Sequence, residues 1–173
     1  QKLPLVFTGP RESAAYFRQL DKFISLTLGP EAQQRYRIIV DDPAEVAREM
    51  QRGFDAVRRS RRRAGDAYNF NWLLKIPPAF QQPFDVSHAS MAGLALSMDQ
   101  PVHERAANLR RAFSGIVAGN VKEQGIRLIE ERGPFEIHAA PQIAKPLDEL
   151  LRAFVAERRM KLVGEYRPSY RIV

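Results

Sequence analysis

Hydrophobic positions near the start of the chain form short continuous runs separated by a stretch with helical spacing. One run covers residues 2–7 and stops at Thr8-Gly9-Pro10, and a second covers residues 36–40. A continuous apolar run stopped by turn residues is typical of a buried strand that feeds a loop. Between the two runs, residues 12–28 place apolar side chains near every third or fourth position, which predicts a helix.

A second helix is predicted after residue 40. Asp41-Asp42-Pro43 has the composition of a helix N-cap, with Pro43 at the first helical position. The order strand, helix, strand, helix is the signature of a parallel sheet covered by helices. Because two such strands need further neighbours, we expect residues 1–52 to be the C-terminal end of a doubly wound, Rossmann-like α/β sheet. Its other strands come from upstream chain, the alternative we favour, or from another copy.

The ends of the two predicted strands are the first place to expect a ligand. Sheets of this kind bind ligands at the carboxyl ends of their strands, where Thr8 and Gly9 on one strand and Asp41 and Asp42 on the other would lie. Thr8 and Gly9 are therefore candidates for a nucleotide-site loop. The alternative, which we prefer, is that these residues serve only as a tight turn and a helix cap.

From Gly53 onwards the pattern changes, and residues 53–173 predict a mixed α+β domain. Helices are predicted at residues 54–63, 86–94, after Pro101 and at 147–160, and strands at 69–76, 135–138 and 166–173. We expect the strands to form a small antiparallel sheet. The long helical stretch contains Ser114-Gly115 and Ala118-Gly119-Asn120, small residues that indicate a helix crossing, a break between two helices or a subunit contact.

Composition adds the expectation of an anionic partner. The chain of 173 residues has a net charge of +7 and a pI near 10.0, with arginine far more frequent than lysine. Guanidinium groups bind phosphate through paired hydrogen bonds, although a GC-rich genome would also enrich arginine. The sequence contains no cysteine, no apolar stretch of membrane-spanning length and no signal peptide at its start, so we expect a cytoplasmic protein.

Five arginines lie within six residues of the helix predicted at 54–63, at positions 58, 59, 61, 62 and 63. Such a cluster is self-repelling unless an anion neutralises it. Arg58 and Arg62 are four residues apart and share a helix face, with Arg59 and Arg63 on the next face, and such a pair suits a phosphate or pyrophosphate. The alternatives are a solvated basic face or cations favoured near a helix C-terminus. The aromatic residues that follow, Tyr68 among them, lead us to favour anion binding.

No catalytic constellation is recognisable in the sequence. It contains no glycine-rich phosphate loop, no HExxH or GxSxG motif and no cysteine nucleophile. His88 is a lone histidine, for which a capping or core role is favoured over catalysis. From the residues alone, the prediction is an anion-binding α/β chain.

Five runs of the sequence resemble a known family: LPLVFTGPRESAAYFRQLD, RYRIIVDDPAEVAR, RRAGDAYNFNW, LRRAFSGIVAGNVKEQGIRLIEERGPF and FVAERRMKL. They are similar to the pyrimidine/purine nucleotide 5'-monophosphate nucleosidases, bacterial enzymes with a LOG-type (lysine-decarboxylase-like) Rossmann domain and a C-terminal domain. The resemblance covers essentially the whole chain. The sequence departs from the family pattern at Ala89, Val163 and Ser169, where Glu, Pro and Cys are usual.

The resemblance implies hydrolysis of the N-glycosidic bond of nucleoside monophosphates to a free base and ribose 5-phosphate, without a cofactor or metal. The family's working motif, PGGxGTxxE, does not occur in this sequence and is expected upstream of Gln1. No catalytic residue is therefore assigned to this chain, and the fragment alone is expected to be inactive. Residues 1–52 would belong to the LOG-type Rossmann domain and residues 53–173 to a regulatory and oligomerisation domain.

The resemblance further implies a homo-oligomer, expected to be a tetramer, that is regulated by the alarmones ppGpp and pppGpp. The positions that match the effector site are Arg58, Ser60, Arg62 and Tyr68. Two rival interpretations remain open: a basic nucleic-acid-binding module and a pure assembly domain. The first is disfavoured because no nucleic-acid recognition element is evident in the sequence.

Overall fold

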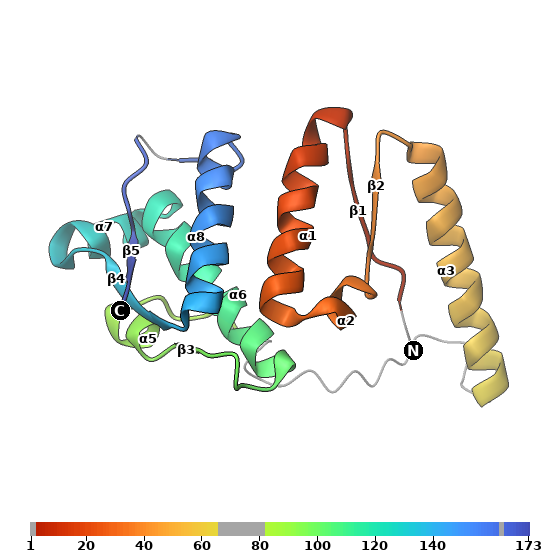
Figure 1. Cartoon of the computed structure of the whole chain (residues 1–173), viewed down its shortest axis with the longest axis horizontal. Coiled ribbons are helices and arrows are strands. Elements are labelled where there is room, and N and C mark those ends of the chain that lie inside the picture. Colours follow the sequence, from red (N-terminus) through yellow and green to blue (C-terminus); the bar gives the residue numbers. More distant parts are fainter. Residues whose placement is uncertain (1–2, 66–81, 163–164) are drawn as a thin grey trace. The chain divides into compact units, whose positions relative to one another are not determined.

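The computed structural model describes residues 3–65, 82–162 and 165–173 (Figure 1). The chain divides into two compact units. The first contains Gln1–Ser25 and Gly29–Ile76, and the second contains Leu26–Leu28 and Pro77–Val173. None of the helices in the described ranges is both long and apolar enough to span a membrane.

The first unit follows the predicted order of strand, helix, strand and helix. Its elements are β1 (Val6–Gly9), a 3-10 turn (Arg11–Ser13), α1 (Ala14–Leu28, except its last three residues), α2 (Pro30–Gln33), β2 (Arg37–Val40) and α3 (Pro43–Ala64). β1 and β2 pair in parallel, with Val6 opposite Arg37 and Gly9 opposite Val40. The predicted parallel pairing is therefore confirmed. β1 begins later than expected, after Pro4, which has no N–H to donate to a strand ladder.

Aromatic side chains hold the strands of the first unit against α1. The ring centroid of Phe7 on β1 lies 6.4 Å from that of Phe17 on α1 and 4.9 Å from that of Tyr36. Phe17, Phe23 and Ile39 are buried. The Tyr36 hydroxyl donates a hydrogen bond of 2.6 Å to Asp21 on α1, and burial together with this bond raises the pKa of Tyr36. Apolar packing and one half-buried polar contact thus place β2 beside α1.

α3 begins and ends where its sequence predicts. The Asp42 side chain accepts a hydrogen bond of 2.8 Å from the backbone N–H of Glu45, and Pro43 occupies the first helical turn. Gly65 ends the helix with φ of 66°, a left-handed conformation that glycine adopts without a steric penalty. The helix passes without a break through Arg52 and Gly53, where the sequence pattern changes.

The second unit contains α5 (His88–Ala92), β3 (Ala95–Leu96), α6 (Val102–Val121), α7 (Glu123–Arg132), β4 (Phe135–Ala139), α8 (Pro141–Ala156) and β5 (Tyr170–Ile172). The strands lie in the order β3-β4-β5, and both pairs are parallel. The expected antiparallel sheet is wrong. α6 and α7 connect β3 to β4, and α8 connects β4 to β5. These helical connections return the chain to the same end of the sheet before each new strand, so the strands run parallel.

The helices around this sheet differ in detail from the prediction. α8 starts at Pro141 and ends at Ala156, whereas residues 147–160 were expected, and the last strand contains only three residues. The strand predicted at residues 69–76 lies outside the described residues. The core consists of side chains that are almost fully buried: Met91, Leu96, Ile116, Phe135, Ile137, Ile143, Leu147, Leu150 and Leu151.

The small residues of α6 allow close approach inside this unit. A Cβ atom at Gly115 would meet the Met91 side chain, and one at Gly119 would meet the Cβ atom of Ser169 at 2.8 Å. The extended backbone of Lys122 separates α6 from α7. The structure therefore confirms a close approach at this run, whereas the run itself lies within α6 and the break between helices comes after it, at Lys122.

Candidate functional site

The ends of β1 and β2 form one candidate site. A cavity of about 430 Å³ lies there, lined by Thr8, Gly9, Pro10, Asp41, Asp42, Pro43 and Val46. The predicted nucleotide-site residues Thr8 and Gly9 are thus at the carboxyl edge of the parallel strands, beside the two aspartates. The parallel register brings the two loops together, since Gly9 is the partner of Val40.

Both aspartates of this cavity already have partners. Asp41 has a positive φ of 61°, its N–H donates to the Gly9 carbonyl at 2.9 Å, and its carboxylate pairs with Arg11 at 3.2 Å. Asp42 caps α3. Because two carboxylates repel a phosphate, the cavity is better suited to hydroxyl donors, such as those of a sugar, than to an anion.

The basic helix α3 forms the second candidate site, and its first half is electrically balanced. Arg48 and Arg52 each lie 2.7 Å from a carboxylate oxygen of Glu45, and Arg52 also lies 2.6 Å from Glu49. The hydrogen bonds from Arg52 and Arg48 lower the pKa of Glu45. These exposed pairs satisfy each other and leave no surplus charge for a ligand.

The second half of α3 carries an excess of positive charge. Residues 56–65 contain five arginines and no Asp or Glu. Arg58 lies 3.8 Å from Asp55, one turn back. In residues 3–65, 82–162 and 165–173, Arg59, Arg62 and Arg63 have no ion pair, and all three are exposed. This half of the helix can therefore attract an anion.

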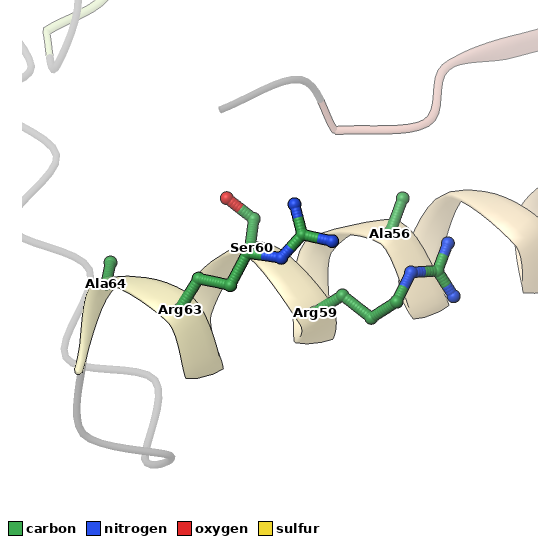
Figure 2. A pocket seen from close by; sticks show the side chains of 5 residues that line it. All are labelled: Ala56, Arg59, Ser60, Arg63 and Ala64. Carbon is green, nitrogen blue, oxygen red and sulfur yellow. The ribbon is translucent and has the colours of Figure 1, made fainter.

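The predicted effector residues do not share one face of α3. Arg58 and Arg62 lie close together around the axis, as predicted. At about 100° per residue, however, Ser60 points about 160° away from both. Ser60 instead joins Ala56, Arg59, Arg63 and Ala64 around a hollow of about 470 Å³ (Figure 2). Tyr68, the fourth predicted residue, lies outside the described residues.

Arg59 and Arg63, which the sequence places on the helix face next to Arg58 and Arg62, line this hollow. Residues 56, 60 and 64 follow the i, i+4, i+8 row, and the two arginines lie at i+3 and i+7 beside it.

His88 is half-buried and has structural contacts. Its Nε2 atom lies 2.9 Å from the Gly133 carbonyl oxygen, and its ring centroid lies 4.8 Å from that of Phe135. The cap of α5 is the neighbouring Ser87, which accepts a hydrogen bond from the backbone N–H of Ser90. Within the described ranges, no three His, Asp or Glu side chains gather in a way that could hold a metal ion.

Comparison with known proteins decides the family. Residues 54–173 match the family described as "Pyrimidine/purine nucleotide monophosphate nucleosidase, C-terminal". The chain belongs to this family. The match begins one residue after Gly53, where the sequence pattern changes, and includes the second half of α3 with its arginine cluster.

The curated relatives extend the similarity to the rest of the chain. Proteins named pyrimidine/purine nucleotide 5'-monophosphate nucleosidase from three Escherichia coli strains, K12, O6:H1 and O157:H7, are each 57% identical over 173 residues. The alignment covers 99% of this chain and 38% of each relative. The resemblance found from the five sequence runs is therefore confirmed, and the chain spans well under half the length of the relatives it matches.

Proposed function

We propose that this chain is the C-terminal part of a nucleosidase that hydrolyses the N-glycosidic bond of nucleoside 5'-monophosphates. Water replaces the base at the sugar carbon, and the products are a free base and ribose 5-phosphate. The observation that supports this proposal most is the 57% identity, which covers 99% of the chain. The catalytic groups are not assigned to residues of this chain, whose part is regulation and assembly.

A direct assay tests this activity. The full-length protein is incubated with AMP, GMP, IMP, CMP and UMP in turn, and the released base is separated by chromatography. Release of the base together with ribose 5-phosphate from at least one of them is expected. The 173-residue chain alone should release none. Failure of the full-length protein on all five nucleotides would contradict the proposal.

We propose that ppGpp and pppGpp regulate this activity by binding to α3. The resemblance assigns Arg58, Ser60, Arg62 and Tyr68 to the effector site, and the exposed arginines of α3 support an anionic ligand. Calorimetry with ppGpp tests the assignment: Arg62→Glu in the full-length protein should abolish binding. Unchanged affinity for ppGpp would contradict the role of Arg62. It would not contradict the proposed nucleosidase activity.

The architecture proposed for the full-length protein follows from the same resemblance. Residues 1–52 would complete a Rossmann-like sheet, with β1 and β2 paired to strands from the rest of the polypeptide. Residues 53–173 would form the regulatory and oligomerisation domain of a cytoplasmic homo-tetramer. The cavity at Thr8 and Gly9 would then lie at the nucleotide-binding edge of the sheet. Light scattering of the full-length protein tests the tetramer.

A nucleic-acid-binding module is the second candidate function, favoured only by the surplus arginines of α3. Phosphate contacts in nucleic acids make affinity fall steeply with salt. Titration with a random DNA duplex at two salt concentrations distinguishes this function from alarmone binding. We expect the DNA duplex to bind the protein only weakly at the lower salt concentration and not at all at the higher one.

A further inference from the structure

A third cavity, of about 380 Å³, lies within the second unit. It is formed by the segment that leads into α5, by α5 and the residues that follow it, and by α6, against which α5 packs. Its walls carry both charges as well as apolar groups: Gln82, Pro83, Phe84, Asp85, Ser90, Gly93, Leu94 and Arg111. The cavity contains none of the residues assigned to the nucleotide loop or to the arginine cluster of α3.

Arg111 is held in this cavity by neutral partners. Its Nη1 atom donates a hydrogen bond of 2.9 Å to the Asn108 side-chain oxygen, and the Asn108 amide donates one of 3.1 Å to the Ala95 carbonyl on β3. Arg111 is half-buried and has no ion pair among the residues that the structure describes. The amide relay therefore orients the guanidinium group without neutralising it, which suits the binding of a carboxylate.

Asp85 brings the opposite charge to the same cavity. Its side chain is exposed, and its carboxylate has no hydrogen bond or ion pair within the described ranges, Arg111 included. A purely anionic ligand would be repelled by Asp85, and a purely cationic ligand would be repelled by Arg111. The pair of unmatched charges therefore favours a ligand that carries one charge of each sign.

The remaining walls limit the size and polarity of this ligand. Leu94 is buried, with 5% exposed, and Phe84 is half-buried beside it in the cavity wall. Gly93 contributes no side chain. The volume of about 380 Å³ lies near the small end of the range for ligand sites, roughly 300–1,000 Å³. A small zwitterion with an apolar body matches these walls.

We propose that this cavity binds a free α-amino acid with an apolar side chain. Arg111 pairs with the α-carboxylate, and Asp85 accepts hydrogen bonds from the α-ammonium group. The side chain of the ligand packs against Phe84 and Leu94. This site goes beyond the proposed nucleosidase and does not depend on it.

Three ligands of nearly the same shape test the pairing of charges without any substitution. They are L-leucine, L-leucinamide, which lacks the carboxylate, and 4-methylpentanoate, which lacks the ammonium group. By calorimetry with the full-length protein, we expect leucine to bind at millimolar concentration or below, and each analogue to bind at least about tenfold more weakly. Equal binding of leucine and either analogue overturns the proposal. So does failure of L-leucine, L-methionine and L-phenylalanine all to bind at millimolar concentration.

Variants of the full-length protein locate the site. R111Q and D85N should each weaken leucine binding at least about tenfold. R111Q should not weaken the binding of leucinamide, which has no carboxylate to lose, and D85N should not weaken that of 4-methylpentanoate. R110Q is the matched control, because it removes one positive charge from an exposed position of the same helix that does not line the cavity. Melting temperatures check that the variants are folded.

Two results with these variants overturn the assignment. One is an equal loss of leucine binding in R110Q and R111Q, which would reflect net charge rather than this cavity. The other is loss of GMP binding in R111Q and D85N with leucine unaffected, which would make the cavity a nucleotide site. Base release by the unchanged protein is measured separately, so failure of the nucleosidase proposal is distinguished from failure of this one.

Discussion

Gly125 of α7 lies directly against the backbone of Ala118 on α6. A Cβ atom at Gly125 would come within 2.3 Å of the Ala118 carbonyl oxygen and 2.5 Å of its carbonyl carbon, much closer than any real contact. The two helices follow each other in the chain, separated by the extended Lys122, so α7 folds back across the end of α6. The atoms nearest to this Cβ position belong to the backbone of α6, so no flexible side chain can move aside to make room.

Gly125→Ala is therefore expected to destabilise the protein by about 1–3 kcal/mol, the usual cost of overpacking, even though alanine is the better helix former. Urea unfolding monitored by circular dichroism measures the change. The exposed neighbour Gln124 supplies the control, because Gln124→Ala should alter the unfolding free energy by no more than about 0.5 kcal/mol. Equal stabilities of G125A and the unchanged protein would contradict the close crossing.

Alkaline pH is expected to weaken the contact between β5 and α8. The Tyr170 hydroxyl donates a hydrogen bond of 3.0 Å to Asp148, and burial, reinforced by this bond, raises the pKa of Tyr170. A raised pKa in the folded state stabilises the protein fully below the unfolded value of about 10, and this stabilisation is lost as pH rises through the folded-state pKa. The unfolding free energy should therefore fall above pH 10.

The substitution Tyr170→Phe tests whether ionisation of Tyr170 causes this loss of stability at alkaline pH. The variant should lose about 1 kcal/mol at pH 8, the usual contribution of such a hydrogen bond. Its unfolding free energy should also fall less steeply above pH 10 than that of the unchanged protein. Urea titrations at pH 8 and pH 11 give both quantities. If both proteins showed the same slope, the alkaline loss would have to come from other groups.

The start of α3 should depend on one side chain. Asp42→Ala removes the acceptor for the Glu45 N–H, and we expect a loss of about 1 kcal/mol. Asp42→Asn keeps an oxygen acceptor and should retain most of the stability, which makes it the matched control. Thermal unfolding of the two variants measures the difference. Equal stability of D42A and D42N would show that the cap contributes nothing.

Arg105 should be replaceable by an apolar residue without loss of stability. Its side chain is buried, with 6% exposed, and has no ion pair within the described ranges. It donates only to the Met98 sulfur at 3.0 Å and the Gln100 carbonyl at 3.2 Å, and its Nε atom has no hydrogen-bond partner there. Burying a charge without a carboxylate partner is costly.

Arg105→Leu should therefore leave the free energy of unfolding unchanged or raise it by about 1 kcal/mol. Denaturant unfolding is again the measurement, and Arg110→Leu, at an exposed position of the same helix, controls for the change in net charge. A loss above about 2 kcal/mol in R105L would show that the buried guanidinium has a stabilising partner.

Local signals predicted most of the helices and strands. Asp42-Pro43 and Gly65 mark the two ends of α3, because a cap needs only a nearby side chain and a left-handed turn needs only glycine. The parallel pairing of β1 and β2 followed from the single helix-length connection between them. The same rule holds for β4 and β5, since a helix was predicted between the strands at 135–138 and 166–173, whereas β3, with two residues, gave no local signal in the sequence.

The sequence by itself determined the family, the positive charge of the helix after Asp55 and the small residues of α6, because these are properties of residue type and spacing. Only the tertiary structure decided what those small residues contact: Met91, Ser169 and the backbone of the next helix. The physical reason is that contacts between residues far apart in the sequence depend on how the helices and strands pack, which local spacing does not encode.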